Sequence, residues 1–176
     1  VVNIAILGYG TVGSGVYQIV NENQAVLRRK CGKDLVVKYV LDLREFPGDP
    51  VQEILTHRFE DILEDDSVRL VVEVMGGVEP ANTFVTACLG KGKSVVTSNK
   101  ELVARHGSRL IRLARENHCN FLFEASVGGG IPIIRPLISS LTADDILEIK
   151  GIVNGTTNYI LSEMTRYGKT FEEVLA

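Results

Sequence analysis

The sequence predicts an α/β fold in which a parallel, doubly wound sheet carries helices on both faces. Short apolar runs alternate with amphipathic stretches along the chain, which is typical of parallel strands joined by right-handed helical crossovers. The first apolar run stops at a glycine-rich turn that opens a helix. The hydrophobic share of 45% and the charged share of 23% are those of a globular protein. A length of 176 residues is enough for one complete domain and the start of another.

The predicted strands are the apolar runs that lack helical spacing, and the predicted helices lie between them. The strands cover residues 4–7, 35–41, 68–75, 94–97 and 120–125. The helices run from the glycine turn to just before Gly32, over 59–63 as a helix or turn, between Pro80 and Gly90, and over 101–116. We expect the first helix to bury one face, made of Val12, Val16, Ile19 and Val20.

The glycine-rich turn after the first strand has the sequence GYGTVG and fits the G-x-G-x-x-G pattern. The pattern alone is weak, but here it follows a buried strand and opens an amphipathic helix, as a dinucleotide-binding loop requires. Its first glycine permits the tight turn, its second lets the backbone approach a pyrophosphate, and its third permits close packing of helix on strand. We therefore expect a Rossmann-type domain that binds NADP or NAD. The residues predicted to contact the cofactor here are Gly8, Gly10, Thr11, Val12 and Gly13.

Two charged residues follow the second predicted strand, where such domains place the group that meets the adenosine ribose. Asp42 favours NAD, because a carboxylate accepts hydrogen bonds from ribose hydroxyls. Arg44 is compatible with NADP, because a guanidinium pairs with a 2′-phosphate. The sequence leaves this choice open, and two solvated loop charges are an alternative interpretation.

Two further loops are predicted at the carboxyl ends of strands, where ligands of a doubly wound sheet collect. In the first, Gly76 lets the cofactor lie against the backbone. In the second, Thr97, Ser98 and Lys100 are candidate cofactor contacts. Lys100 is also a candidate catalytic residue that holds a substrate carboxylate or moves a proton to a carbonyl oxygen. The alternative is a surface lysine that begins a helix, a position that the helix dipole disfavours for a cation.

These segments occur in the order found in homoserine dehydrogenases, which the sequence resembles over nearly its whole length. The matching segments are residues 8–13, 73–77 (EVMGG), 97–100 (TSNK), 124–132 (EASVGGGIP) and 154–159 (NGTTNY). The resemblance implies reduction of aspartate semialdehyde to homoserine by a nicotinamide cofactor, or the reverse oxidation, in the synthesis of threonine, methionine and isoleucine.

The resemblance also implies a site for a monovalent cation, sodium or potassium. Its ligands would be the Glu124 carboxylate and the backbone carbonyls of Val127, Gly129 and Ile131. Oxygen ligands with one carboxylate suit a hard cation, and glycines let carbonyls turn inward. The alternative for Glu124 is a buried acid that hydrogen bonds satisfy.

Gly155 and Thr156 match positions near the substrate in the family. The residues alone predict that 154–157 form a turn that caps the next helix, with Asn154 or Thr156 as the capping residue. Both roles are compatible.

The regular alternation of strand-like and helix-like stretches changes near residue 130, and we place a domain boundary there. Residues 1–132 form the predicted dinucleotide-binding domain, and residues 133–176 begin an α+β domain for substrate binding, catalysis and dimerisation. In it we expect a strand over 146–153 and a helix over 158–167. The resemblance implies that the family's main catalytic aspartate and lysine lie beyond Ala176. We therefore expect negligible turnover from this piece alone, some cofactor affinity, and a homodimer for the full-length protein.

Composition excludes several other classes of partner. A net charge of −3 and a pI near 5.7 argue against nucleic acid and anionic membranes, and no apolar run is long enough to span a bilayer. The three cysteines lie far apart and lack metal-site spacing, so we expect reduced, mostly buried thiols in a cytoplasmic protein. His57, His106 and His118 show no catalytic pairing, and surface or helix-packing roles are expected.

Three competing functions fit the residues less well. An aspartate-semialdehyde dehydrogenase needs a nucleophilic cysteine at a strand–helix junction, which neither Cys88 nor Cys119 provides. Another amino-acid dehydrogenase, such as aspartate dehydrogenase, shares the loop and sheet but not the segment 154–159. A non-catalytic NAD(H)-sensing module requires an exposed interaction surface, and the sequence shows no strong one.

Overall fold

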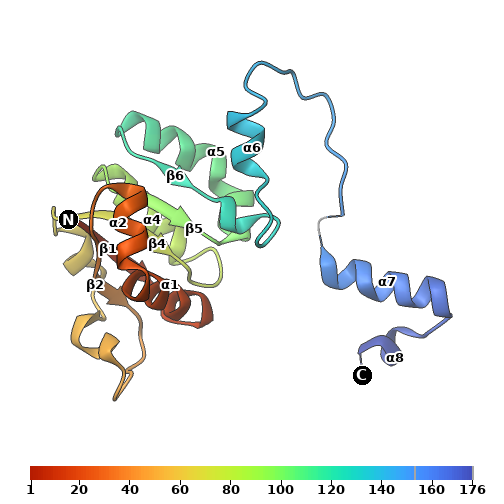
Figure 1. Ribbon diagram of the computed structural model, residues 1–176, viewed down its shortest axis with the longest axis horizontal. Helices are drawn as coiled ribbons and strands as arrows, with labels where there is room; N and C mark the ends of the chain where they lie inside the picture. Colours follow the sequence, from red (N-terminus) through yellow and green to blue (C-terminus); the bar gives the residue numbers. More distant parts are fainter. Residues whose placement is uncertain (153, 176) are drawn as a thin grey trace. The chain divides into compact units, whose positions relative to one another are not determined.

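Six parallel strands form one sheet in the order β3-β2-β1-β4-β5-β6 (Figure 1). The order reverses between β1 and β4, and such a switch point is where doubly wound sheets bind ligands. The predicted α/β class is confirmed. The strands are β1 (Val2–Leu7), β2 (Leu35–Leu41), β3 (Leu55–Thr56), β4 (Val68–Glu73), β5 (Ser94–Thr97) and β6 (Phe121–Leu122).

The computed structural model describes residues 1–152 and 154–175, which belong to two units, Val1–Arg135 and Pro136–Ala176. The first unit holds the sheet together with α1 (Thr11–Glu22), α2 (Gln24–Cys31), η1 (Pro50–Ile54), α3 (Phe59–Leu63), α4 (Ala81–Gly90), α5 (Lys100–Glu116) and η2 (Glu124–Ser126). The short α6 (Ile134–Ser139) runs across the division. The second unit holds α7 (Gly155–Tyr167) and α8 (Phe171–Leu175).

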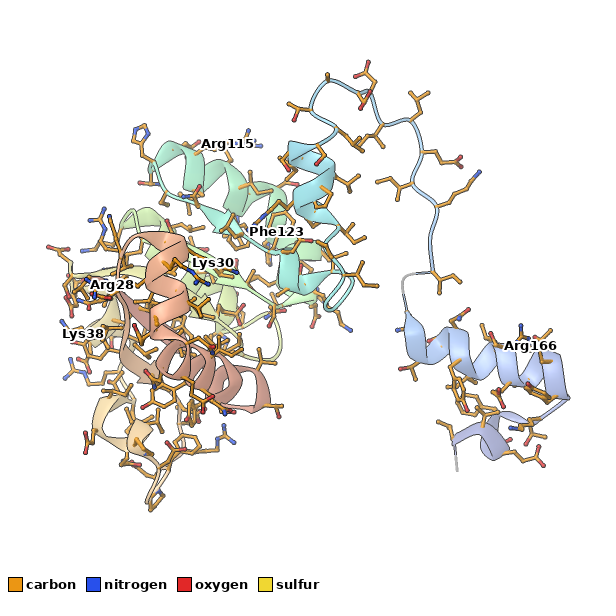
Figure 2. All side chains as sticks on the ribbon, in the orientation of Figure 1. Arg28, Lys30, Lys38, Arg115, Phe123 and Arg166 are labelled. Carbon is orange, nitrogen blue, oxygen red and sulfur yellow. The ribbon has the colours of Figure 1, made fainter. Side chains whose placement is uncertain are left out.

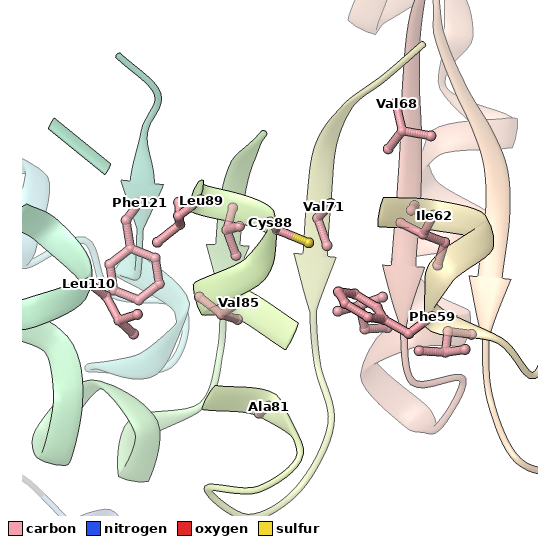
Figure 3. Packing of buried hydrophobic residues seen from close by; sticks show 14 of the residues in the cluster. Phe59, Ile62, Val68, Val71, Ala81, Val85, Cys88, Leu89, Leu110 and Phe121 are labelled. Atoms are coloured by element: carbon pink, nitrogen blue, oxygen red, sulfur yellow. The ribbon is translucent and has the colours of Figure 1, made fainter. Parts of the chain in front are cut away.

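Apolar side chains alternate between the two faces of the central strand. Ala5 and Leu7 of β1 pack in a buried cluster with residues of α3, α4 and α5. Figure 3 shows part of this cluster, in which Val71 of β4 lies near Cys88 of α4. Ile4 and Ile6 belong to the opposite cluster, with residues of α1 and η1. Burial of both faces is the reason that the strands appear in the sequence as continuous apolar runs.

The glycine turn determines which face of α1 is buried. Gly13 and Val20 are buried, whereas Val12 is 52% and Ile19 is 58% exposed. The predicted buried face is therefore wrong at Val12 and Ile19. Gly13 brings the helix closest to the sheet, so the buried positions follow from Gly13 at helical spacing rather than from Val12.

The predicted first helix is two helices, because the chain breaks at Asn23. The backbone N–H of Asn23 and its side-chain amide both donate to the carbonyl of Ile19, at 3.1 Å each, which ends α1. The second helix, α2, ends at Gly32, whose φ of 68° is the left-handed conformation that glycine tolerates. Cys31, in its last turn, is exposed, while Cys88 is buried, so the expectation of mostly buried thiols is wrong for Cys31.

Basic side chains lie in the last turns of three helices. Figure 2 shows Arg28 and Lys30 on α2, Arg115 on α5 and Arg166 on α7. A cation at the C-terminal end of a helix interacts favourably with the helix dipole. Among residues 1–152 and 154–175, none of the helices has both the length and the apolar character needed to cross a membrane.

Two predicted strands differ from the structure. Residues 146–152 adopt no regular structure, and Val153 lies outside the described residues. The described part of the second unit offers no other strand, so the backbone groups of this segment have no ladder to join. The strand predicted over 120–125 is limited to β6, because the chain turns at Glu124 to form η2.

Lys93 is a buried cation that joins the starts of two neighbouring strands. It precedes β5 and is only 4% exposed. Its Nζ donates to the carbonyl oxygens of Asp65 at 2.6 Å and Val68 at 3.1 Å, where β4 begins. Burial lowers the pKa of the Lys93 amino group. The side chain therefore provides donors for two carbonyls of the turn before β4.

Replacement of Lys93 should destabilise the first unit. Lys93→Met keeps most of the aliphatic chain but removes two charged hydrogen bonds to buried carbonyls, of which that of Asp65 still accepts from the N–H of Val68. The free energy of unfolding should therefore fall by about 2 kcal/mol. Lys91→Met is the matched control, because Lys91 is half exposed and pairs with Glu64 at the surface. Its effect should stay within about 0.5 kcal/mol. Urea unfolding of both variants checks the difference, and equal losses would contradict the structural role of Lys93.

Candidate functional site

A pocket of about 520 Å³ opens at the carboxyl ends of β1, β2 and β4. This volume lies in the range of small-molecule and cofactor sites. The loops after these three strands form most of its wall, and the remaining wall is largely aromatic and apolar. The lining residues are Gly8, Tyr9, Gly10, Leu41, Asp42, Leu43, Arg44, His57, Phe59, Val74, Met75, Gly76, Pro80 and Phe84.

The three glycines of the first loop have distinct surroundings. Gly8 has a φ of +98°, and a Cβ there would lie 3.1 Å from Cγ of Met75. A Cβ on Gly13 would lie 2.0 Å from the carbonyl oxygen of Gly8, so the helix packs against the turn more closely than any side chain permits. Around Gly10 no atom lies within 4 Å of a Cβ position. Gly10 is thus the position at which the backbone is open to a ligand.

The helix α1 begins directly after Gly10, which lines the pocket. Gly10 is its N-terminal capping residue, and no side chain caps the helix. Thr11 and Val12, the first two helical residues, are exposed. Uncapped N–H groups at the positive end of a helix form an anion-binding site. The loop therefore has the geometry and polarity that a diphosphate requires.

Asp42 and Arg44 form an ion pair at the edge of the pocket, so they are not two separately solvated charges. The Arg44 guanidinium donates to Asp42 through Nε at 3.0 Å and Nη2 at 2.9 Å. The N–H of Tyr9 donates to the same carboxylate at 2.8 Å, and Arg44 Nη2 also donates to the Tyr9 carbonyl at 3.0 Å. Hydrogen bonds from Arg44 hold the pKa of Asp42 well below its usual range. The acceptor sites of Asp42 are thus largely occupied, and the more exposed Arg44 is the group presented to a ligand.

His57 was expected to have a surface or helix-packing role without a catalytic pairing. It is exposed, and it also lines the pocket within a hydrogen-bonded network. Its Nδ1 lies 2.6 Å from the carbonyl oxygen of Asp42, and its Nε2 lies 2.7 Å from Oε1 of Glu45. The hydrogen bond with the Asp42 backbone and that with Glu45 raise the pKa of His57. The imidazole thus joins β3 to the loop after β2 beside Arg44.

Phe59 and Phe84 form an aromatic wall, which no sequence pattern indicated as part of the site. Their rings are stacked with centroids 4.1 Å apart and an interplanar angle of 15°. They come from α3 and α4, and Pro80 lies beside them in the lining. A flat apolar wall of this kind suits a planar base.

A buried polar network lies under the loops that follow β4 and β5. Glu73 is fully buried, and its Oε1 accepts a hydrogen bond from the N–H of Met75 at 2.8 Å. The Thr97 hydroxyl donates to Oε2 of Glu73 and accepts from the N–H of Asn99 at 2.9 Å. Asn99 in turn donates to the carbonyl of Gly77 at 2.6 Å. Thr97 is therefore turned inward and supports the loop, whereas Ser98 is only partly covered.

Lys100 is exposed as the first residue of α5. Asn99 caps this helix, because its side-chain oxygen accepts from the N–H of Leu102 at 3.0 Å. The capping bond orients the helix start at the carboxyl edge of the sheet. A role for Lys100 in proton transfer or substrate binding remains a prediction.

Glu124 caps the start of α6. Its carboxylate accepts hydrogen bonds from the backbone N–H groups of Ile133 at 2.5 Å, Ile134 at 3.0 Å and Arg135 at 2.7 Å. The hydrogen bond from Ile133 is the largest of the effects that lower the pKa of Glu124. Glu124 is half-buried rather than buried, and three of its roughly four acceptor sites are occupied. In the described residues no three His, Cys, Asp or Glu side chains gather to hold a metal ion.

Gly155 and Thr156 open α7 in the second unit. Asn154 caps this helix, since its side-chain oxygen accepts from the N–H of Thr157 at 2.8 Å. The predicted helix cap is therefore confirmed with Asn154 as the capping residue. The predicted substrate contacts of Gly155 and Thr156 remain a prediction.

Comparison with known proteins points to one family for both parts of the chain. Residues 8–124 match the family model described as homoserine dehydrogenase, NAD binding domain, and residues 132–176 match the homoserine dehydrogenase model. The homoserine dehydrogenase of Bacillus subtilis is 44% identical over 99% of this chain and that of Lactococcus lactis 40% over 99%. The chain spans only 41% and 42% of the lengths of these two relatives.

Solved structures give the same result. A homoserine dehydrogenase from Thiobacillus denitrificans aligns with a TM-score of 0.87 and 37% identity, over 99% of this chain and 41% of that one. A hyperthermophilic archaeal homoserine dehydrogenase mutant in complex with NADPH aligns with a TM-score of 0.83 and 30% identity, over 99% of this chain and 59% of that one.

The different surroundings of two glycines predict different effects of alanine. Gly13→Ala should lower the free energy of unfolding by about 2 kcal/mol or more, because the new methyl group collides with the Gly8 carbonyl. Gly10→Ala should leave stability nearly unchanged, since its methyl group meets no atom within 4 Å. That same methyl group occupies the space a diphosphate needs, so ligand affinity should fall. Thermal unfolding and dinucleotide titration of both variants check this, and equal destabilisation would contradict it.

Stability should respond to pH in opposite directions through Glu73 and Glu79. Burial raises the pKa of Glu73 above its usual 4.5, so its contribution to folding is present below 4.5 and is lost as pH rises through the raised value. Hydrogen bonds from Asn82 and Thr83 lower the pKa of Glu79, so its contribution is present above 4.5 and is lost as pH falls through the lowered value.

Two isosteric variants separate these effects. As pH rises from about 4 to about 8, the Tm of Glu73→Gln should increase relative to the parent chain, and that of Glu79→Gln should decrease. Thermal unfolding in a series of buffers measures both differences. If the Tm difference from the parent chain changed in the same direction for both variants, the raised pKa of Glu73 would be contradicted.

Proposed function

The chain belongs to the homoserine dehydrogenase family, and on that basis we propose that its first unit binds NADPH or NADH in the pocket at the sheet edge. The observation that carries the proposal is the open backbone at Gly10 beside the uncapped first turn of α1. These N–H groups bind the diphosphate. The stacked pair of Phe59 and Phe84 supports a site for the adenine base.

The adenosine ribose is proposed to lie at Asp42 and Arg44. Because Arg44 already neutralises Asp42, a 2′-phosphate there meets a guanidinium rather than a free carboxylate. A ribose without the phosphate meets the same pair, so the site accepts both cofactors and Arg44 favours NADPH. The loops that contain Gly76 and residues 97–100 are proposed to contact the rest of the cofactor. In that contact Thr97 acts from beneath the loop, while Ser98 and Lys100 face outward.

For the whole protein we propose the interconversion of aspartate semialdehyde and homoserine. The chain spans 41% of the length of the B. subtilis relative, so this activity is a proposal about the protein and not about these residues alone. The bound dinucleotide supplies or accepts the hydride. Lys100 is the candidate residue for holding the substrate carboxylate or for moving a proton to the substrate's carbonyl oxygen. Gly155 and Thr156 are proposed to hold the substrate. Residues 1–132 and 133–176 are the proposed functional division, and a cytoplasmic homodimer is the expected assembly.

A monovalent cation is proposed at Glu124 and the carbonyls of Val127, Gly129 and Ile131. Positive φ values of 70° at Gly128 and 59° at Gly129 turn the backbone sharply here, which supports the presence of inward carbonyls. The three N–H donors on Glu124 leave roughly one acceptor site for the ion. Sodium or potassium would therefore be held mainly by carbonyl oxygens.

Calorimetric titration of the chain with NADPH and NADH tests the cofactor site. Both should bind, and Arg44→Ala should weaken NADPH about tenfold more than NADH, because the lost charged hydrogen bonds involve the 2′-phosphate. Arg28→Ala is the matched control, since Arg28 is exposed on α2 away from the pocket. Binding of neither dinucleotide would overturn the proposal.

A turnover assay with homoserine and oxidised cofactor accompanies the titration. We expect negligible turnover from the 176 residues alone, because the resemblance places the main catalytic aspartate and lysine beyond Ala176. Robust homoserine oxidation by this chain would contradict that expectation and leave the binding proposal in place.

A further inference from the structure

Glu73 is a buried acid that the proposed binding contacts do not use. It is the last residue of β4, it is 0% exposed, and it pairs in register with Leu7 of β1 and Thr97 of β5. Its neighbours within the strands, such as Val71 and Val95, are apolar and fully buried. An apolar residue would fill this position without the cost of burying a carboxyl group. A polar residue at a position that packing would give to an apolar one commonly marks a functional site.

The Glu73 carboxylate accepts hydrogen bonds from both neighbouring loops. One carboxylate oxygen accepts from the N–H of Met75, in the loop that lines the pocket. The other accepts from the Thr97 hydroxyl, at the start of the loop that leads to Lys100. Asn99 provides a second connection between the loops, because its backbone N–H donates to the Thr97 hydroxyl and its side chain donates to the carbonyl of Gly77. The two loops are therefore connected through one carboxyl group.

The strand order indicates which half of a bound dinucleotide would lie over these loops. A dinucleotide lies across the switch point, here between β1 and β4, and its adenosine ribose meets the loop after β2. In that arrangement the adenosine half would cover the side of β1, β2 and β3. The nicotinamide half would then extend over the ends of β4 and β5, whose last residues are Glu73 and Thr97.

We propose that Glu73 is a positioning residue for the nicotinamide half of the dinucleotide, acting through the Met75–Gly77 loop and the Thr97–Lys100 loop. The inference rests on the proposed cofactor site. Glu73 does not touch the ligand. It holds the two loops at one spacing, so that the backbone of the first and the outward side chains of the second meet the ring together. Pre-organised loops of this kind improve affinity, because less ordering is needed on binding.

The burial of Glu73 and its hydrogen bonds act in opposite directions. Burial raises the pKa of the carboxyl group, and hydrogen bonds from Thr97, Met75 and Asn99 lower it. Glutamine keeps part of this hydrogen-bonding pattern. Its amide oxygen can accept from the N–H of Met75, and its amide nitrogen can donate to the Thr97 oxygen. Leucine fills a similar volume and makes neither bond. This contrast allows a positioning role to be separated from simple packing.

The experiment compares two ligands on the same set of variants of the 176-residue chain. NADPH carries the nicotinamide ring, and ADP-ribose carries the adenosine, the diphosphate and the second ribose without that ring. Dissociation constants for both, the nicotinamide fluorescence of bound NADPH, and Tm are measured for the parent, Glu73→Leu, Glu73→Gln and Thr97→Val. Glu79→Gln is the matched control, because Glu79 is an exposed carboxylate near the same loop and accepts hydrogen bonds from Asn82 and Thr83 at the start of α4.

Glu73→Leu should raise the NADPH dissociation constant about tenfold, with ADP-ribose affinity unchanged and the fluorescence enhancement reduced. Glu73→Gln should have an NADPH dissociation constant within about threefold of that of the parent. The dissociation constant of Thr97→Val should lie between those of Glu73→Gln and Glu73→Leu. Glu79→Gln should bind both ligands as the parent does.

Unchanged NADPH binding in Glu73→Leu, or an equal loss of both ligands, would overturn the inference and leave the proposed cofactor site standing. If Glu73→Leu does not fold, Thr97→Val decides by the same criterion. Failure of the parent chain to bind either ligand would instead overturn the proposed function, and the inference with it.

Discussion

The close approach of Gly13 to the carbonyl oxygen of Gly8 is the constraint on which the site depends. A Cβ at position 13 would lie 2.0 Å from that oxygen, so only glycine allows α1 to begin this near the end of β1. The approach puts the first turn of the helix at the carboxyl edge of the sheet with its N–H groups uncapped. It also decides which side of α1 is buried, and this is the reason that Val20 faces inward while Ile19 faces solvent.

Charged groups then hold the surrounding loops in place. Asp42 and Arg44 fasten the loop after β2 to the peptide of Tyr9, through bonds to its N–H and its carbonyl. Glu73 performs the equivalent task between the loops after β4 and β5. Buried or half-buried charges are tolerated only where hydrogen bonds satisfy them. Asp42, Arg44 and Glu73 are therefore engaged with backbone groups, and these hydrogen bonds hold the loops in one arrangement.

Patterns within short stretches predicted most of the first unit correctly. Apolar runs, glycine positions and helical spacing are local properties, and they located β1, β2, β4 and α5 within a few residues. Contacts between distant residues left no such pattern. His57 meets Glu45 across 12 residues and Phe59 meets Phe84 across 25, and neither pair has a spacing that indicates proximity. The strand predicted over 146–153 failed over its described residues, because alternating apolar residues cannot form a ladder without a neighbouring strand.

The fold class, the glycine loop and the family follow from the amino-acid order, because each depends on residues that are contiguous or lie in a set order. The role of each polar side chain depends instead on the packed fold. This fold turned Thr97 inward to Glu73, placed Arg44 over Asp42, and committed Glu124 to three backbone donors. A charged or hydroxyl side chain binds whichever partner the packed backbone brings within about 3 Å, and that choice is made by the arrangement of strands and helices.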